Sequence, residues 1–188
     1  MLDHFDIIAP LYDKLIGPPS PAQLRQHLAL PTAGRMLDAG GGTGRVSAQL
    51  REFVDELVLL DQSLPMLRKA QDKGLAALRG DVTRMPFPDT FFDRIVVVDA
   101  LHHFVDAAAA IHDLLRVLKP GGRLVIEEPD LQHNKVRILA LAERLLLMDS
   151  HFFSPADIHA MAERAGGQGY IAVDGHFAAW VIVEKPTV

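Results

Sequence analysis

The sequence predicts an α/β protein with a Rossmann-like, doubly wound and mostly parallel seven-stranded sheet that ends in an antiparallel C-terminal hairpin. Two observations carry this prediction. Short apolar runs alternate with helical patterns along most of the chain, and a glycine-rich stretch, residues 40–44, separates the first apolar run from a helical pattern. A strand, a glycine loop and a helix in this order form the first unit of a doubly wound fold.

Length and composition favour a single domain over residues 1–188. The chain has 188 residues, of which 49% are hydrophobic, enough for one substantial core and too few for two ordinary domains. The net charge is −5 and no run of Lys and Arg exceeds two residues, so we expect no nucleic-acid partner. The absence of cysteine excludes disulfides, thiolate metal sites and cysteine nucleophiles.

The sequence shows neither the pattern of a signal peptide nor that of a membrane span. Residues 1–6 lack the basic region and apolar run of a signal peptide. The most apolar later stretch, Val136–Met148, is interrupted by Glu143 and Arg144, which argues against a membrane span. We therefore expect a cytoplasmic protein with no membrane span.

Residues 1–30 precede the first strand. Apolar residues from Phe5 to Leu15 recur at helical spacing, prolines then break the pattern, and Pro21–Leu30 is compatible with a second helix. Two interpretations remain open: the helices pack on the sheet, or they form an N-terminal helical lid in which Tyr12 lies over a ligand pocket. Pockets of such folds lie at the carboxyl edge of the sheet.

The glycine loop discriminates between ligand classes. Asp38 lies near the end of the first strand, and Gly40, Gly42 and Gly44 follow at every second position. The dinucleotide fingerprint G-x-G-x-x-G requires a third glycine where Arg45 stands, so the loop disfavours NAD. The residues that follow, 45–53, predict a helix.

The second strand, Leu57–Leu60, is followed by a candidate ligand residue. Asp61 ends this apolar run and can accept hydrogen bonds from both ribose hydroxyls of a nucleotide, or it is an ordinary acid at a strand end. Ser63 then predicts the N-cap of a helix, in which Met66 and Leu67 face inward.

The third strand, Ala76–Arg79, is weaker and leads to Asp81 and Val82. The Asp81 carboxylate and the Val82 N–H have the polarity to read the edge of a base, whereas Asp81 taken alone is typical of a turn. Residues 85–89 form a loop because two prolines exclude regular structure.

The strongest strand, Ile95–Val98, delivers Asp99 to the carboxyl edge, and His102 and His103 follow shortly afterwards. We expect no metal site, because neighbouring histidines point apart and no H-x-x-x-H spacing accompanies them. We expect one of the two histidines instead to reach the substrate as an acid, a base or a polar contact.

The C-terminal third predicts a helix over Ala107–Leu118, ended by residues 119–122, and a fifth strand over Leu124–Ile126. Glu127 and Glu128 follow, and we expect them to be solvated. The pattern then predicts helices at Val136–Met148 and from Ser154 to Gly166, so that 131–166 form a helical segment near the substrate side. The last part of the chain predicts a hairpin of two strands, 170–173 and 177–184.

Taken together, the motifs resemble the class I S-adenosylmethionine-dependent methyltransferases, in particular the small-molecule ubiquinone/menaquinone C-methyltransferase-like (type 11) subgroup. No single motif is decisive, but their order and spacing are specific. The segments that carry the resemblance are 5–13, 38–44, Asp61, 80–81, 85–88, 91–93, 99–103 and 116–122.

The resemblance implies roles for individual residues. Asp38, Ala39, Gly40, Gly41 and Gly42 would surround the methionyl part of S-adenosylmethionine, and Asp61, Gln62 and Met66 would lie at the ribose and adenine. Asp81 and Val82 would read the adenine edge, the main chain of Asp99 would lie near the methionyl amine, and Tyr12 would close the pocket. Tyr12, His102 and His103 are the candidates for a catalytic base, which is needed only if the acceptor must lose a proton.

The expected activity is therefore methyl transfer from S-adenosylmethionine to a small-molecule acceptor by in-line displacement. A protein that binds S-adenosylmethionine without transfer, as a partner or regulatory subunit, is the alternative. The sequence is compatible with a homodimer, and it leaves open both the acceptor and whether carbon, oxygen or nitrogen is methylated.

Overall fold

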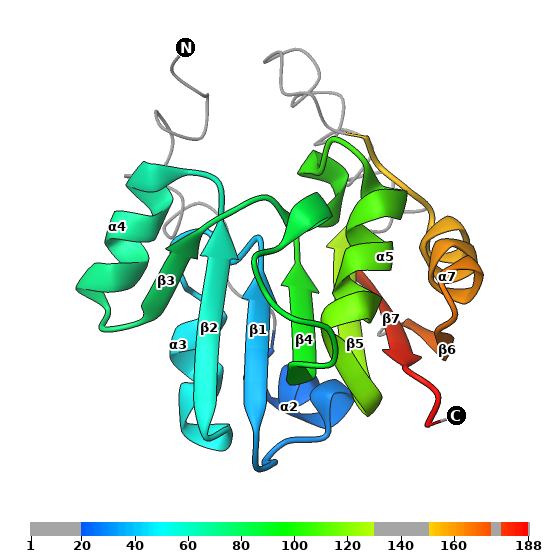
Figure 1. Cartoon of the computed structure of the whole chain (residues 1–188), viewed down its shortest axis with the longest axis horizontal. Helices are drawn as coiled ribbons and strands as arrows, with labels where there is room; N and C mark the ends of the chain where they lie inside the picture. Colours follow the sequence, from blue (N-terminus) through cyan, green and yellow to red (C-terminus); the bar gives the residue numbers. More distant parts are fainter. Residues whose placement is uncertain (1–19, 130–150, 174–177, 188) are drawn as a thin grey trace.

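The computed structural model describes residues 20–129, 151–173 and 178–187 (Figure 1). Two helices expected from the sequence lie outside the described residues: Val136–Met148 and the N-terminal helix that contains Tyr12. The described helices are α2 (Pro21–Leu28), α3 (Ser47–Leu50), α4 (Leu64–Asp72), α5 (Ala107–Val117) and α7 (Pro155–Arg164), with 3₁₀ turns η1 (Arg51–Phe53), η2 (Val82–Arg84) and η3 (Leu101–His103).

Seven strands form one sheet in the order β3-β2-β1-β4-β5-β7-β6. The strands are β1 (Arg35–Ala39), β2 (Glu56–Asp61), β3 (Ala76–Arg79), β4 (Phe92–Val98), β5 (Leu118–Pro129), β6 (Gln168–Val173) and β7 (Ala178–Glu184). The first five pair in parallel, whereas β7 runs antiparallel to both β5 and β6. The predicted seven-stranded, mostly parallel sheet with its antiparallel C-terminal hairpin is confirmed.

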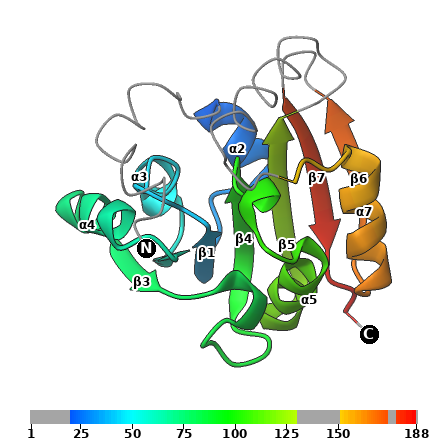
Figure 2. The same cartoon turned by 90° about the horizontal axis from the view of Figure 1, so that it is seen from above.

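Helices cover both faces of the sheet, as Figure 2 shows from above. On one face, α5 and α7 pack on a core that includes Leu37, Ile95 and Ile126. On the other face, α2 and α3 cover Met36, Val96 and Trp180. The strands therefore alternate their side chains between two apolar layers, which explains why their sequences read as nearly continuous apolar runs.

The glycine loop and the segment after it differ from the expectation. The predicted helix over 45–53 begins later, at Ser47, and breaks into the short α3 and the 3₁₀ turn η1. The helix α4 starts as predicted, with the Ser63 hydroxyl accepting from the Met66 N–H at 3.5 Å and with Met66 and Leu67 buried.

The boundary between α5 and β5 was wrong in the sequence-based prediction. The helix ends at Val117, and β5 starts at Leu118, before the residues expected to form a loop. The reason is tertiary pairing: the Gly121 N–H donates to the Lys185 carbonyl at 2.7 Å, and the Lys185 N–H donates to the Gly122 carbonyl at 3.1 Å. The C-terminal segment thereby extends the strand into the glycines.

The parallel strands β1, β2 and β4 end at the same edge of the sheet (Figure 1). Since the loops that follow them carry the predicted ligand residues, this edge is where a site can form. Among the described residues, no helix is both long and apolar enough to cross a membrane.

Candidate functional site

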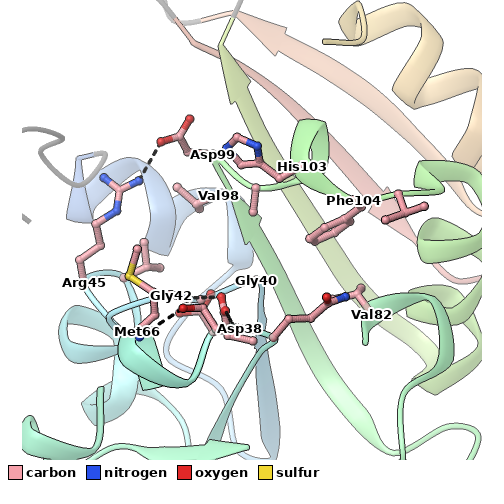
Figure 3. Close-up of a pocket in the computed structure, with 17 residues that line it drawn as sticks. Asp38, Gly40, Gly42, Arg45, Met66, Val82, Val98, Asp99, His103 and Phe104 are labelled. Atoms are coloured by element: carbon pink, nitrogen blue, oxygen red, sulfur yellow. Dashed lines mark hydrogen bonds and ion pairs between the residues drawn. The ribbon is translucent and has the colours of Figure 1, made fainter. Parts of the chain in front are cut away.

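A pocket lies at this carboxyl edge, between the loops that follow β1, β2 and β4 (Figure 3). Its lining draws on the glycine loop, on the turn into α4, on η2 and on the turn after β4. The lining residues are Asp38, Gly40, Gly41, Gly42, Arg45, Val46, Asp61, Gln62, Ser63, Met66, Val82, Val98, Asp99, Ala100, His103, Phe104 and Val105.

Backbone geometry explains the glycines of the loop. Gly40, Gly42 and Gly44 have φ angles of 71°, 54° and 76°, in the left-handed region that favours glycine. A Cβ atom at Gly44 would lie 2.2 Å from Leu75 Cδ1, whereas a Cβ at Gly42 would meet nothing within 4 Å. Gly44 is therefore required for packing, and Gly42 presents open main chain to the pocket.

Asp61 joins the glycine loop to the turn that follows β2. Its Oδ2 accepts from the Gly42 N–H at 2.8 Å, and its Oδ1 accepts from the Ser63 N–H at 2.8 Å. The loop also docks on the end of β2, because the Gly40 N–H donates to the Leu60 carbonyl at 2.8 Å. Both carboxylate oxygens are thus held in a fixed orientation at the pocket wall.

Asp38 forms the floor of the pocket and is almost completely buried, with 1% of its surface exposed. The Ser47 hydroxyl donates to Asp38 Oδ2 at 2.6 Å. Burial raises the pKa of Asp38 from 3.8 to about 6, and the hydrogen bonds from Ser47 counteract only part of that effect. The carboxyl therefore titrates close to neutral pH.

An ion pair crosses the pocket between the glycine loop and the end of β4. Arg45 Nη2 lies 3.2 Å from Asp99 Oδ2, and both side chains are largely buried (Figure 3). Asp99 has a φ of 52°, which is unusual for a residue other than glycine. The chain therefore changes direction sharply at Asp99 as it leaves β4.

The two adjacent histidines have different environments. His103 lines the pocket, whereas His102 is 1% exposed and is not among the lining residues. His102 Nδ1 lies 2.5 Å from Glu128 Oε2. The expectation that Glu127 and Glu128 are solvated was wrong: they are 8% and 5% exposed, because β7 and the turn after β4 cover the end of β5.

The loop between β3 and β4 contributes Val82 to the pocket, while Asp81 caps η2. The Asp81 carboxylate accepts from the Thr83 N–H and hydroxyl, both at 2.8 Å. A buried carboxylate of α5 holds the same loop, since Asp113 Oδ2 accepts from the Met85 N–H at 2.7 Å. Arg116 adds hydrogen bonds to the Met85 and Phe87 carbonyls.

Most residues predicted for the cofactor meet in this pocket. Ala39 and Asp81 are exceptions, since they do not line it, and Tyr12 lies outside the described residues. Of the two histidines predicted as catalytic candidates, His103 lines the pocket and His102 does not. Sequence reasoning did not assign Arg45, Ser63, Phe104 or Val105 to the pocket. Arg45 and Ser63 could have been predicted, because each directly follows a motif that was assigned to the ligand. No sequence pattern indicated a role for Glu128.

Comparison with known proteins supports the resemblance. Residues 37–126 match the family model described as a methyltransferase domain. The ubiquinone/menaquinone biosynthesis C-methyltransferase of Stutzerimonas stutzeri is 39% identical over 105 residues, 50% of this chain and 41% of that protein. The demethylmenaquinone methyltransferase of Thermus thermophilus is 38% identical over 139 residues, 66% of this chain and 63% of that protein.

The match thus spans about half of the length of these curated relatives. A solved structure from Thermotoga maritima, described as an S-adenosylmethionine-dependent methyltransferase and possible histamine N-methyltransferase, shares the fold with a TM-score of 0.81. It is 21% identical, and the alignment covers 96% of this chain and 98% of that one. Residues 37–126 thus match a methyltransferase domain, and the chain is similar to curated ubiquinone/menaquinone C-methyltransferases over part of their length.

Proposed function

We propose that the chain binds S-adenosylmethionine in the pocket at the carboxyl edge and transfers its methyl group to a small, largely apolar acceptor, a reduced quinone. The observation that carries the proposal is the joint placement of Gly42 and Asp61. Gly42 offers open main chain, Asp61 offers a carboxylate at its side, and a 2.8 Å hydrogen bond holds the two together.

The shape and donor set of the pocket suit this cofactor. The void at the Cβ position of Gly42 lets a ligand approach the main chain closely. Each Asp61 oxygen already accepts one backbone N–H, and a carboxylate oxygen has a second lone pair for a ribose hydroxyl. Met66 and Val82 supply apolar surface on the same side for an adenine ring.

Charge favours S-adenosylmethionine over a dinucleotide. Asp38, Asp61 and Asp99 all line the pocket, and the guanidinium of Arg45 is already engaged with Asp99. Such a pocket attracts the sulfonium and ammonium groups of S-adenosylmethionine and repels the pyrophosphate of NAD. The short α3 also begins beyond Arg45, so the loop lacks a long helix N-terminus for a pyrophosphate.

When bound, S-adenosylmethionine supplies a methyl group on a sulfonium that becomes neutral as the methyl leaves. The residues of the chain have to align the acceptor with this group and exclude water. Val98, Ala100 and Phe104 form an apolar wall for that purpose. His103, on the same turn, also lines the pocket, and in this proposal its ring takes the proton that the acceptor loses.

The choice of a reduced quinone rests on two lines of support. The relative with 39% identity is named as a ubiquinone/menaquinone biosynthesis C-methyltransferase, and the relative with 38% identity as a demethylmenaquinone methyltransferase. The pocket wall is apolar on its β4 side, which suits an aromatic ring, and His103 supplies a polar group at that wall. Loss of a hydroxyl proton makes the ring carbon of a hydroquinone a better nucleophile, so one base meets the chemical need.

Binding is tested by calorimetric titration with S-adenosylmethionine, S-adenosylhomocysteine and NADH. We expect the first two to bind, and Asp61→Ala to weaken them at least tenfold, about 1.4 kcal/mol. Asp55→Asn is the matched control: Asp55 also accepts a backbone N–H, from Gly34 at 2.8 Å, but lies at the opposite end of β2. Binding of NADH alone would contradict the proposal.

Transfer is tested with methyl-deuterated S-adenosylmethionine and a short-chain demethylmenaquinol, kept reduced and analysed by mass spectrometry. We expect one labelled methyl group on the ring carbon. Tight binding of S-adenosylhomocysteine without any labelled product from this quinol, or from a panel of phenols and amines, would favour the non-catalytic binding protein instead.

A further inference from the structure

The turn after β4 is fastened to the end of β5 by three consecutive backbone amides. The Asp99 N–H donates to the Glu127 carbonyl at 2.9 Å. The Ala100 and Leu101 N–H groups both donate to Glu128 Oε1, at 3.0 and 2.7 Å. One buried side chain of β5 therefore satisfies the second and third of these amides.

The second oxygen of Glu128 holds His102. An ionised Glu128 only accepts hydrogen bonds, so we assign the proton of the contact between His102 Nδ1 and Glu128 Oε2 to the histidine. The His102 ring stacks on Phe152, with centroids 4.6 Å apart, and its backbone carbonyl accepts from the His151 N–H at 2.7 Å. These contacts fix His102 on the side of the turn that faces away from the pocket.

His103, in contrast, is held on the pocket side. Its ring centroid lies 3.9 Å from that of His102, so the buried histidine forms one of the surfaces against which His103 rests. Ala100, His103 and Phe104 of this turn all line the pocket (Figure 3). The orientation of the pocket wall is therefore coupled to the contacts that Glu128 makes behind it.

Holding a turn with a buried carboxylate costs free energy, because the charge loses its hydration and has to be compensated by hydrogen bonds. The turn it holds is also strained, since Asp99 adopts a φ of 52°. Strain and a buried charge at the edge of a ligand pocket indicate that the geometry of this turn matters for what the pocket does.

We propose that Glu128 is a positioning residue, which acts through His102 and through the two amides of the turn to hold His103 and Phe104 against the acceptor. The inference rests on the proposed function and adds to it a residue at least 24 positions away in sequence from those it positions. Glu128 touches neither ligand in this arrangement, because it lies behind the turn and is not among the lining residues.

The variant Glu128→Gln tests the proposal with little change in shape. Its amide oxygen still accepts from the two backbone N–H groups, but its amide NH₂ has to donate to His102 Nδ1 and so forces the other tautomer. We expect kcat with the short-chain demethylmenaquinol to fall about tenfold or more, while the affinity for S-adenosylhomocysteine changes less than about threefold.

Two further readouts separate positioning from folding. In ¹⁵N-histidine NMR spectra, His102 should change from the Nδ1–H to the Nε2–H tautomer in Glu128→Gln, and the ring signals of His103 should shift with it. In a double-mutant cycle, His102→Gln combined with Glu128→Gln should reduce kcat no further than the more damaging single change, because both act along one path.

The matched control is Glu184→Gln. Glu184 also forms an ion pair with a residue of β5, since its Oε1 lies 2.5 Å from Arg123 Nη2. Its side chain is exposed, and it lies at the opposite end of the β5–β7 pair from the turn. We expect its kcat to stay within about twofold of the wild type, as for exposed ion pairs generally.

Several results would overturn the proposal: an unchanged kcat in Glu128→Gln despite the tautomer change, a loss of kcat that matches an equal loss of S-adenosylhomocysteine binding, or multiplicative effects in the double variant. A wild-type protein that binds S-adenosylhomocysteine but does not methylate the quinol would refute the acceptor alone. The positioning role could still be tested in that case. It would be refuted if the NMR ring signals of His103 had the same chemical shifts in Glu128→Gln as in the wild type.

Discussion

The two sides of the pocket are built in different ways. On the side of β1, the shape of the glycine loop depends on residue type, because Gly40, Gly42 and Gly44 have positive φ angles and Leu75 leaves no room for a side chain at Gly44. Hydrogen bonds to Leu60 and Asp61 of β2 hold the loop in place. On the side of β4, the turn at 99–103 takes its shape from Glu128, which is distant in sequence. Local backbone preference forms one wall, and a buried carboxylate forms the other.

This difference predicts where each wall is vulnerable. The glycine loop should fail through steric clashes and backbone strain, which act on stability and on ligand binding. The turn after β4 should fail through loss of charge and hydrogen bonds, which act on the acceptor side. The following substitutions test the distinction.

Gly44→Ala should have the largest effect. The added Cβ would lie 2.2 Å from Leu75 Cδ1 in a buried cluster, and the residue would keep a φ of 76°. Together, overpacking and backbone strain should lower the free energy of unfolding by about 3 kcal/mol, measured by urea denaturation. Gly166→Ala is the control: it has a φ of 91° but open space around the Cβ position, so a loss of about 1 kcal/mol is expected. Equal losses in both variants would show that packing at Gly44 contributes nothing.

Asp38→Asn should change the pH dependence of stability. In the folded protein the pKa of Asp38 is raised from 3.8 to about 6. Between these pH values Asp38 therefore holds a proton in the folded state that it has lost in the unfolded state, and the folded state loses stability as the pH rises through this range. At pH 7 this penalty is fully present, about 3 kcal/mol in the wild type, and the asparagine removes it. Urea unfolding at pH 4 and pH 7 measures the effect. Parallel pH profiles of the two proteins would contradict the raised pKa.

Gly42→Ala should separate ligand binding from stability. The Cβ has nothing within 4 Å, so the variant should fold with a cost of only about 1 kcal/mol for its φ of 54°. The same methyl group enters the pocket, and we expect S-adenosylhomocysteine to bind at least about tenfold more weakly, 1.4 kcal/mol by calorimetry. Unchanged affinity would place the ligand away from Gly42 and would argue against the proposed site.

Arg45→Gln removes the ion pair that joins the two walls. Arg45 Nη2 and Asp99 Oδ2 are 3.2 Å apart, and Asp99 retains its backbone contact to Glu127 without Arg45. Because both side chains line the open pocket, water can hydrate Asp99 once Arg45 is replaced. We therefore expect the smallest effect, a loss of about 1 kcal/mol or less in the free energy of unfolding. Arg35→Gln serves as the comparison, because its ion pair with Glu56 is more exposed. A loss above that of Gly44→Ala would show that the walls depend on each other more than the structure indicates.

Residues with a local signature were predicted well. The Ser63 cap, the strand Ala76–Arg79 and the capping box that starts α7 at Ser154 appear where the sequence indicated them. Their signals are hydrogen bonds and turn preferences between residues three or four apart, which need no knowledge of the rest of the fold. The pocket position of Gly42 and Asp61 followed from the same local reasoning combined with the strand order of a doubly wound sheet.

Residues whose environment depends on distant partners were predicted poorly. An acidic pair after an apolar strand is usually solvated, yet Glu128 is buried because the amides of residues 100 and 101 and the ring of His102 surround it. The start of β5 was missed because Leu118 pairs with Phe92 of β4 and because Lys185 bonds the glycine pair that by itself predicts a loop.

By itself, the sequence determined the doubly wound fold, the glycine loop and the acid at the end of the second strand, because periodicity, glycine spacing and capping residues act over a few positions. Only the tertiary structure decided which histidine faces the pocket and which carboxylate supports it. That choice depends on hydrogen bonds between the turn after β4 and the end of β5, which sheet pairing brings together although they lie far apart in the sequence.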